Sequence, residues 1–292
     1  MSLNLFRQRI SDLGYELTPE VLPAVLELLD AEQQQLARRI PPAATDLHYA
    51  EHERQVLDIY KPADAGVTPL PVLMFVHGGG FLRGDKGSAE RWHNACVGRM
   101  AADRGFIGVV MNYRLAPEHT WPAGGEDVGL AVDWLTGNIH RFGGDPDKIV
   151  LVGTSAGAVH CATYLRLHPQ TAGIRGMVLL SGLYGYTPLD ERDRFYYGEQ
   201  TTYPSRWPKE VLTETNLPLL IACAEFDPPR FQAEFLGIMQ ARLRARGVLP
   251  RSILLSGHNH YSMASHLGTS DTRLADEIVS FVHDSLNKGL QR

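Results

Sequence analysis

Hydrophobic residues along this chain follow two alternating patterns. Six short runs are apolar almost throughout, at residues 71–76, 106–111, 148–153, 174–180, 217–223 and 251–256. Between most of these runs the apolar residues recur at the spacing of a helix, as in residues 125–142 and 231–247. A strand that is apolar on both faces needs cover on both faces, and crossover helices provide that cover in a parallel sheet. The pattern therefore predicts an α/β fold with a mostly parallel sheet and helices on both faces.

Three regions depart from this alternation. Residues 18–40 carry apolar side chains at helical spacing and predict an N-terminal helical segment over about 1–42, whereas residues 56–60 alternate like an early strand of a hairpin. Residues 182–216 form a longer connection than usual, and such insertions are often lids over active sites, although a purely structural excursion fits almost as well. We expect one domain over 1–292, with 182–216 as a small cap. Its aromatic residues are then the candidate walls of a small pocket: Tyr184, Tyr186, Phe195, Tyr196, Tyr197, Tyr203 and Trp207.

Charge and cysteine usage narrow the range of partners and compartments. The net charge is -5 and no run of Lys or Arg occurs, so we expect neither nucleic acid nor an anionic membrane as a partner. Three widely separated cysteines, Cys96, Cys161 and Cys223, do not suit a disulfide framework and favour a reducing compartment. The first fourteen residues are too polar for the apolar part of a secretory signal, so the cytoplasm is the expected location.

A candidate nucleophile follows the third apolar run. Ligands of open parallel sheets bind beyond the carboxyl ends of the strands, and the sequence GTSAG occupies residues 153–157 at such an end, before a helical pattern. In a G-x-S-x-G turn the glycines let a strand turn sharply into a helix, which exposes the serine hydroxyl at the helix N-terminus. The pattern predicts Ser155 as a nucleophile, with an ordinary helix N-cap as the alternative.

A serine nucleophile requires a base and a carboxylate, which follow it along the chain in this kind of fold. Asp227 lies just beyond the run that ends at Cys223, and Glu225 is its competitor. His260 opens the helical pattern after the last run, with His258 as the alternative base. His266 is expected to lie within that helix. His258 and His260 also suit a metal site, but no further cluster completes one at a familiar spacing. We therefore expect neither metal nor cofactor.

The sequence HGGGF at residues 77–81 places three glycines at the end of the first apolar run. A tight turn is the simple interpretation. If Ser155 attacks a carbonyl, however, the resulting oxyanion needs preorganised N–H donors, and glycines leave such donors free of side chains. We predict an oxyanion hole from Gly78, Gly79 and Ala156, with Gly80 as a further candidate. His77 is expected to orient this loop.

Several of these motifs together resemble a known family. HGGGF at 77–81, YRLAPEHTWPAGGEDV at 113–128, GTSAG at 153–157, Asp227 before Pro228, and His260 resemble the hormone-sensitive-lipase-like carboxylesterases of the α/β-hydrolase fold. The stretch HGGGFLRGDK is also similar to kynurenine formamidases. The resemblance covers about residues 45–285. It implies a cofactor-free serine hydrolase in which Arg114 and Glu118 fix the loop beneath the site. The separation of Ser155 and Asp227 is short for that family, which indicates a reduced cap.

The sequence thus predicts a serine carboxylesterase that hydrolyses small, short-acyl esters through an acyl-enzyme. An amidase of the formamidase type is the first alternative, because it uses the same triad but must protonate a poorer leaving group. A non-catalytic binding protein on a hydrolase fold is the second alternative, because a fold alone does not imply activity.

Overall fold

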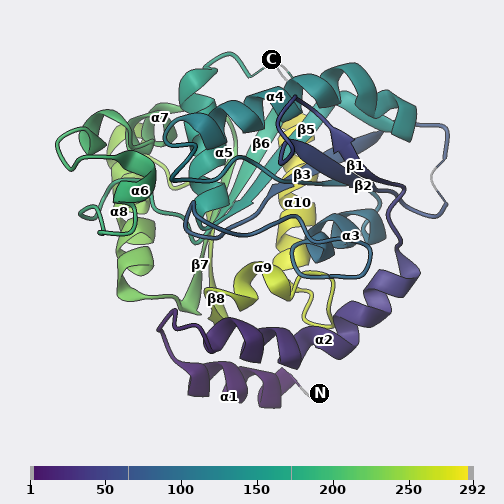
Figure 1. Ribbon diagram of the computed structural model, residues 1–292, viewed down its shortest axis with the longest axis horizontal. Helices are drawn as coiled ribbons and strands as arrows, with labels where there is room; N and C mark the ends of the chain where they lie inside the picture. Colours follow the sequence, from purple (N-terminus) through teal and green to yellow (C-terminus); the bar gives the residue numbers. More distant parts are fainter. Residues whose placement is uncertain (1–2, 65, 172, 289–292) are drawn as a thin grey trace.

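The computed structural model describes residues 3–64, 66–171 and 173–288 and is built around one eight-stranded sheet (Figure 1). The strand order is β1-β2-β4-β3-β5-β6-β7-β8. The strand bounds are β1 Ala44–His48, β2 Val56–Tyr60, β3 Leu70–Val76, β4 Ile107–Met111, β5 Gly144–Thr154, β6 Ile174–Leu180, β7 Leu219–Phe226 and β8 Arg251–Asn259. β1 and β2 pair antiparallel, β2 pairs antiparallel with β4, and all other neighbours are parallel. The predicted mostly parallel sheet is confirmed, and β1 and β2 form the expected early hairpin.

Helices cover both faces of this sheet, which explains why its strands are apolar throughout. Leu73 and Phe75 of β3 pack in one buried cluster with residues of α3 (Ala95–Asp103) and α10 (Arg273–Lys288). Met74 and Val76 face the opposite way, into a second cluster with α4 (Ala123–Asn138), α5 (Ala156–Leu167) and α8 (Pro229–Arg246). Successive side chains of a strand point to opposite faces. Because both faces are covered here, every position of a run such as 72–76 is buried, and apolar residues do not alternate with polar ones.

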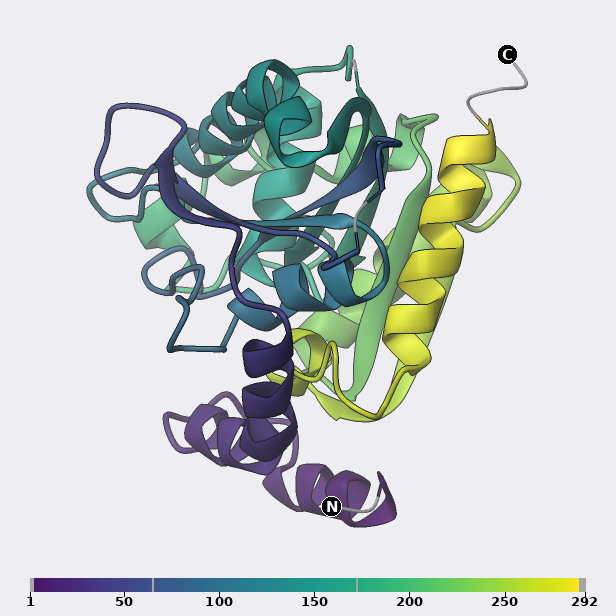
Figure 2. The same ribbon diagram turned by 90° about the vertical axis from the view of Figure 1, so that its right-hand side faces the viewer.

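The N-terminal helical segment packs beside one end of the sheet rather than over a face (Figure 2). It contains α1 (Leu3–Leu13) and α2 (Val21–Arg39), so the predicted helix over 18–40 is present. Gln33 of α2 is fully buried and donates its amide to the carbonyl oxygens of Ser265 (2.8 Å) and Leu267 (3.0 Å). The segment is thereby fixed to the turn that follows β8, which includes the short helix α9 (Ser262–Ser265).

The remaining short elements lie in two connections. The 3-10 helix η1 (Ile139–Phe142) links α4 to β5, and residues 182–216 contain α6 (Arg194–Tyr197), η2 (Tyr203–Ser205) and α7 (Lys209–Glu214). All three cysteines are buried free thiols. Within the described ranges, the helices are too short or too polar to cross a lipid bilayer.

Candidate active site

Ser155 occupies a sharp turn between β5 and α5. Its backbone has φ +53° and ψ -120°, a conformation that non-glycine residues rarely adopt. A Cβ on Gly153 would lie 2.5 Å from the carbonyl oxygen of Gly157, and a Cβ on Gly157 would lie 2.0 Å from that of Val76. Both positions therefore exclude any side chain. The two glycines let α5 start close against β3 and β5, which leaves the Ser155 hydroxyl at the carboxyl edge of the sheet.

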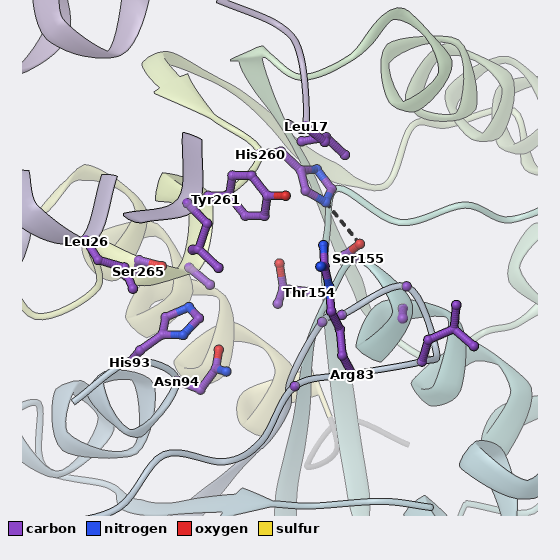
Figure 3. A pocket seen from close by; sticks show the side chains of 18 of the residues that line it. Leu17, Leu26, Arg83, His93, Asn94, Thr154, Ser155, His260, Tyr261 and Ser265 are labelled. Atoms are coloured by element: carbon purple, nitrogen blue, oxygen red, sulfur yellow. Dashed lines mark hydrogen bonds between the residues drawn. The ribbon is translucent and has the colours of Figure 1, made fainter. Parts of the chain in front are cut away.

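The structure brings Ser155, His260 and Asp227 into one hydrogen-bonded row (Figure 3 shows the first link). His260 Nε2 lies 3.0 Å from Ser155 Oγ, and His260 Nδ1 lies 2.8 Å from Asp227 Oδ1. These residues are 105 and 33 positions apart in the sequence. The row has the geometry in which an imidazole accepts a serine proton while a carboxylate fixes its tautomer.

Asp227 is fully buried and receives several further hydrogen bonds. Ser181 Oγ donates to Asp227 Oδ2 at 2.6 Å, and the Ala224 N–H donates to the same oxygen at 2.8 Å. Burial alone raises the pKa of this carboxyl, but the hydrogen bonds from His260, Ser181 and Ala224 outweigh it, so its pKa lies below the ordinary value. Asp227 is therefore a carboxylate that faces His260.

Ser181 was not singled out from the sequence. It follows β6 with φ +48°, and its contact with Asp227 joins the carboxyl ends of two neighbouring strands. A single serine after a strand carries no distinctive sequence pattern, so only the fold identifies this contact.

Glu225 and His258, the alternatives to Asp227 and His260, make other contacts. Glu225 is exposed and accepts a hydrogen bond from the Gly257 N–H at 2.7 Å. His258 is fully buried, with Nε2 3.2 Å from Asp271 Oδ2 and Nδ1 3.1 Å from Ser262 Oγ. Its ring packs 4.0 Å from that of His266, the residue directly after α9, and burial lowers its pKa. His258 and His260 therefore face different carboxylates. Among the described residues, no group of three or more His, Cys, Asp or Glu is arranged to hold a metal ion.

The HGGGF loop lies beside the serine because of strand register. Val76 at the end of β3 pairs with Gly153 at the end of β5, so the residues that follow each strand meet. A Cβ on Gly78 would lie 3.1 Å from Ser155 Cβ, and one on Gly79, where φ is +133°, would lie 1.9 Å from the Arg83 carbonyl oxygen. Ala156 is the first residue of α5, so its N–H has no intrahelical acceptor. Backbone without a side chain thus lies against the serine at Gly78.

His77 holds this loop from beneath. Its ring is fully buried, stacks on Tyr113 at 4.3 Å, and places Nδ1 2.7 Å from the Gly78 carbonyl oxygen. Burial lowers the pKa of His77 to about 4, so the ring is neutral at pH 7 and one nitrogen carries the donated hydrogen. The C=O and N–H of a trans peptide point in opposite directions, so this bond turns the Gly79 N–H away from His77.

Arg114 and Glu118 behave differently. Arg114 Nε donates to Asp127 Oδ1 at 2.9 Å and its backbone N–H donates to Asp127 Oδ2 at 2.7 Å, which fixes the segment after β4 against α4. Glu118 is exposed, and within the described chain its side chain makes no hydrogen bond or ion pair. The structure therefore gives Arg114 the contacts that the resemblance implied, and gives Glu118 none.

A cavity of about 1500 Å³ opens over Ser155 and His260. Its walls include Leu17, Leu22 and Leu26 from the N-terminal segment, together with Leu183 and Phe195 from the segment after β6. The N-terminal contribution was not predicted, because a helical pattern shows which face is apolar but not which part of the fold it covers.

The prediction that aromatic residues of 182–216 form the walls of the pocket is largely wrong. Of the seven aromatic residues, Phe195 alone lies among the described residues that line the cavity. Tyr184, Tyr196, Tyr197 and Tyr203 are at most 2% exposed. Three of them pack in an apolar cluster with Phe81, where Tyr196 stacks on the Phe81 ring at 4.4 Å. Aromatic side chains bury a large area, so they stabilise this connection from within.

Comparisons with known proteins agree with this architecture. Residues 57–178 match the family described as BD-FAE. A probable isoprenylcysteine alpha-carbonyl methylesterase of Oryza sativa subsp. japonica is 40% identical over 231 residues, which cover 74% of this chain and 49% of that protein. The solved structure of esterase B from Lactobacillus rhamnosis, inhibited by a tributyrin phosphonate, superposes with a TM-score of 0.71 at 18% identity, and 94% of this chain and 98% of that one are covered. The chain has the α/β-hydrolase fold.

The sequence likeness of this chain to its relatives is partial. Esterase LipC of Mycobacterium tuberculosis is 37% identical over 109 residues, which cover 37% of this chain and 26% of that esterase. The chain spans about half or less of the length of the first curated relatives that it matches. The relation of this chain to kynurenine formamidases stays a prediction.

Proposed function

We propose that this α/β-hydrolase is a serine carboxylesterase with Ser155 as nucleophile, His260 as general base and Asp227 as its orienting carboxylate. The observation that carries the proposal is the continuous row from Ser155 Oγ to His260 Nε2 (3.0 Å) and from His260 Nδ1 to Asp227 Oδ1 (2.8 Å). The names of the matched relatives, esterases from bacteria and plants, support the same reaction class.

In the first half of the reaction the Ser155 hydroxyl attacks the ester carbonyl while its proton moves to His260 Nε2. The imidazolium that forms is stabilised by the buried carboxylate of Asp227 through Nδ1. The carbonyl oxygen becomes an oxyanion, which the N–H groups of Gly78, Gly79 and Ala156 stabilise. When the tetrahedral intermediate collapses, His260 returns its proton to the leaving alcohol, and the acyl group remains on Ser155.

In the second half water replaces the alcohol. His260 accepts a proton from water as the water oxygen attacks the acyl carbonyl, and the same N–H groups stabilise the second oxyanion. Ser155 leaves as it regains the proton from His260. The released acid and the free enzyme complete the cycle with no other reactant.

The walls beside the nucleophile support short acyl groups. On the side where α5 begins, Phe81, Ala156 and Val159 line the cavity and belong to the closed apolar cluster that also contains Tyr196. Inserting extra methylenes against a packed wall costs typically about 1 to 3 kcal/mol. The opposite side of the cavity extends towards α2, so we place the acyl group against Phe81 and Val159 and the alcohol group beneath α2.

We further propose that the enzyme acts on small molecules in the cytoplasm. Its three cysteines remain free thiols, which suits a reducing compartment. The net charge of -5, without a basic run, suits neither nucleic acid nor an anionic membrane as a partner.

The substrate class is tested by kcat/KM for p-nitrophenyl formate, acetate, butyrate, octanoate and palmitate, with N-formylkynurenine measured in parallel. We expect the best rates for acyl groups of about two to six carbons, because each buried CH₂ contributes about 0.8 kcal/mol until the wall is reached. Palmitate turned over as fast as butyrate would contradict the short acyl site. N-formylkynurenine hydrolysed much faster than every ester would identify an amidase instead.

A further inference from the structure

The end of the cavity beneath α2 carries several polar side chains. His93, Asn94 and Ser265 line this end near Leu26, and Tyr261 lies between them and the Ser155–His260 pair (Figure 3). His93 and Asn94 come from the loop before α3, and Ser265 ends α9. These three residues are called the polar end below.

The polar end has hydrogen-bonding groups that the protein does not use. Within the described chain, no hydrogen bond involves the His93 imidazole, the Ser265 hydroxyl or the Asn94 side-chain oxygen. Ser265 is 2% exposed and Asn94 9% exposed. His93 is half-buried and all three residues line the cavity, so these groups are free to form hydrogen bonds with a bound molecule.

The polar end is also rigidly held. Asn94 donates its amide to the Asp85 carbonyl oxygen at 2.7 Å, and Trp92 donates its indole N–H to Asp30 of α2 at 2.8 Å. A Cβ on Gly87 would lie 2.4 Å from the His93 carbonyl oxygen, so the loop is closely packed on itself. Groups fixed in advance lose little conformational freedom when a ligand binds.

The charges nearby favour a neutral ligand group. Burial lowers the pKa of His93 to about 4, so its ring is neutral at pH 7, with one donor and one acceptor nitrogen. Among the charged residues that line this part of the cavity, Asp85 and Arg91 pair with each other at 3.0 Å, and Asp30 accepts the Trp92 indole N–H at 2.8 Å. A hydroxyl group, which both donates and accepts, matches a neutral imidazole and a serine hydroxyl together.

We propose that the polar end is a binding site for a hydroxyl group carried on the alcohol part of the ester, at a distance from the scissile bond. This inference rests on the proposed esterase function. The Tyr261 ring lies along the carbon spacer, and His93 and Ser265 hydrogen-bond the hydroxyl. The enzyme would therefore select monoesters of diols, or of similar hydroxylated alcohols, over esters of plain alcohols of equal length.

The test compares matched acetate esters. Monoacetates of 1,4-butanediol, 1,6-hexanediol and 1,8-octanediol are measured against butyl, hexyl and octyl acetate, and the ratio of kcat/KM is taken for each pair. At the length that reaches the polar end we expect the hydroxylated ester to be favoured by about 3- to 10-fold for each hydrogen bond gained. A ratio near or below one at all three lengths would overturn the proposal.

Variants show whether the preference comes from this site. His93→Phe keeps a ring of similar size without nitrogen atoms, and Ser265→Ala removes only the hydroxyl; both should bring the ratio towards one. His119→Phe is the matched control, because His119 packs against His52 and does not line the cavity within the described residues. A preference that persists in folded His93→Phe and Ser265→Ala would place the recognition elsewhere.

Hydrolysis of p-nitrophenyl acetate separates this proposal from the proposed function. That ester has no remote hydroxyl, so both variants should retain most of the wild-type rate. If the wild-type protein hydrolyses no ester at all, the proposed function fails. If it hydrolyses p-nitrophenyl acetate and shows no diol preference, the polar end alone is refuted. If His93→Phe does not fold, the wild-type ratios and Ser265→Ala still decide the question.

Discussion

Removal of the Ser181 hydroxyl should weaken catalysis without touching the substrate. Ser181 Oγ donates to Asp227 Oδ2 at 2.6 Å, and Ser181 is 2% exposed and is not among the described residues that line the cavity. A hydrogen bond to a charged group contributes about 1.5 to 3 kcal/mol. In Ser181→Ala the pKa of Asp227 rises and the carboxylate is held less firmly towards His260. If the whole contribution is needed in the transition state, kcat falls by about 10- to 100-fold.

The assay is steady-state hydrolysis of p-nitrophenyl butyrate, with kcat and KM determined separately. KM should stay within about twofold of the wild-type value, because Ser181 contacts Asp227 and not the substrate. Ser181→Gly is the matched control. Glycine also lacks the hydroxyl, so this variant should lose as much activity as Ser181→Ala. Because glycine suits the positive φ of +48° at this position, the variant should unfold at a higher temperature than Ser181→Ala. A Ser181→Gly variant with wild-type kcat would show that the hydroxyl is not needed, and the reasoning would fail.

Three further predictions concern the triad, the turn and acid stability. Ser155→Ala and His260→Ala should each lower kcat by about four to six orders of magnitude with little further loss when combined, whereas His258→Ala should retain most activity; near-additive losses would contradict the triad. Gly157→Ala should lower the free energy of unfolding by about 3 kcal/mol, measured by urea denaturation, while Gly137→Ala, with nothing within 4 Å of its Cβ, should not. Burial lowers the pKa of His160 to about 3, so the unfolded chain takes up a proton at a higher pH than the folded protein does. The free energy of unfolding therefore falls as pH drops from about 6.5 towards 3. His160→Phe should flatten this dependence by about 1.4 kcal/mol per pH unit between pH 6 and 4, and an unchanged slope would refute the reasoning.

The sequence predicted the sheet well because its runs are long and unambiguous. Each of the six apolar runs overlaps a strand, from β3 to β8, since a doubly covered strand has no polar face to obscure it. The elements that carry Ser155, Asp227 and His260 were also predictable, because each residue follows directly on the end of a strand. The row of hydrogen bonds among these residues depends on the order of strands in space, which the sequence does not state.

The cavity walls were harder to predict. The tyrosines of residues 182–216 resemble pocket walls in composition, but Tyr196, Tyr197 and Tyr203 are buried with Phe81 instead. The helix α2 was recognised as a helix, yet its place beside the cavity depends on the buried contacts of Gln33 with the turn after β8. Contacts between residues more than 200 positions apart leave no local pattern.

The central claim is that Ser155 is an activated nucleophile that forms a covalent acyl-enzyme. The most direct measurement is intact-protein and peptide mass spectrometry after reaction with a fluorophosphonate probe, with Ser155→Ala as control. The account predicts one probe adduct per chain, located on Ser155 and lost in Ser155→Ala. A correctly folded wild-type protein that takes no label, or that is labelled elsewhere while Ser155→Ala is labelled equally, would contradict it.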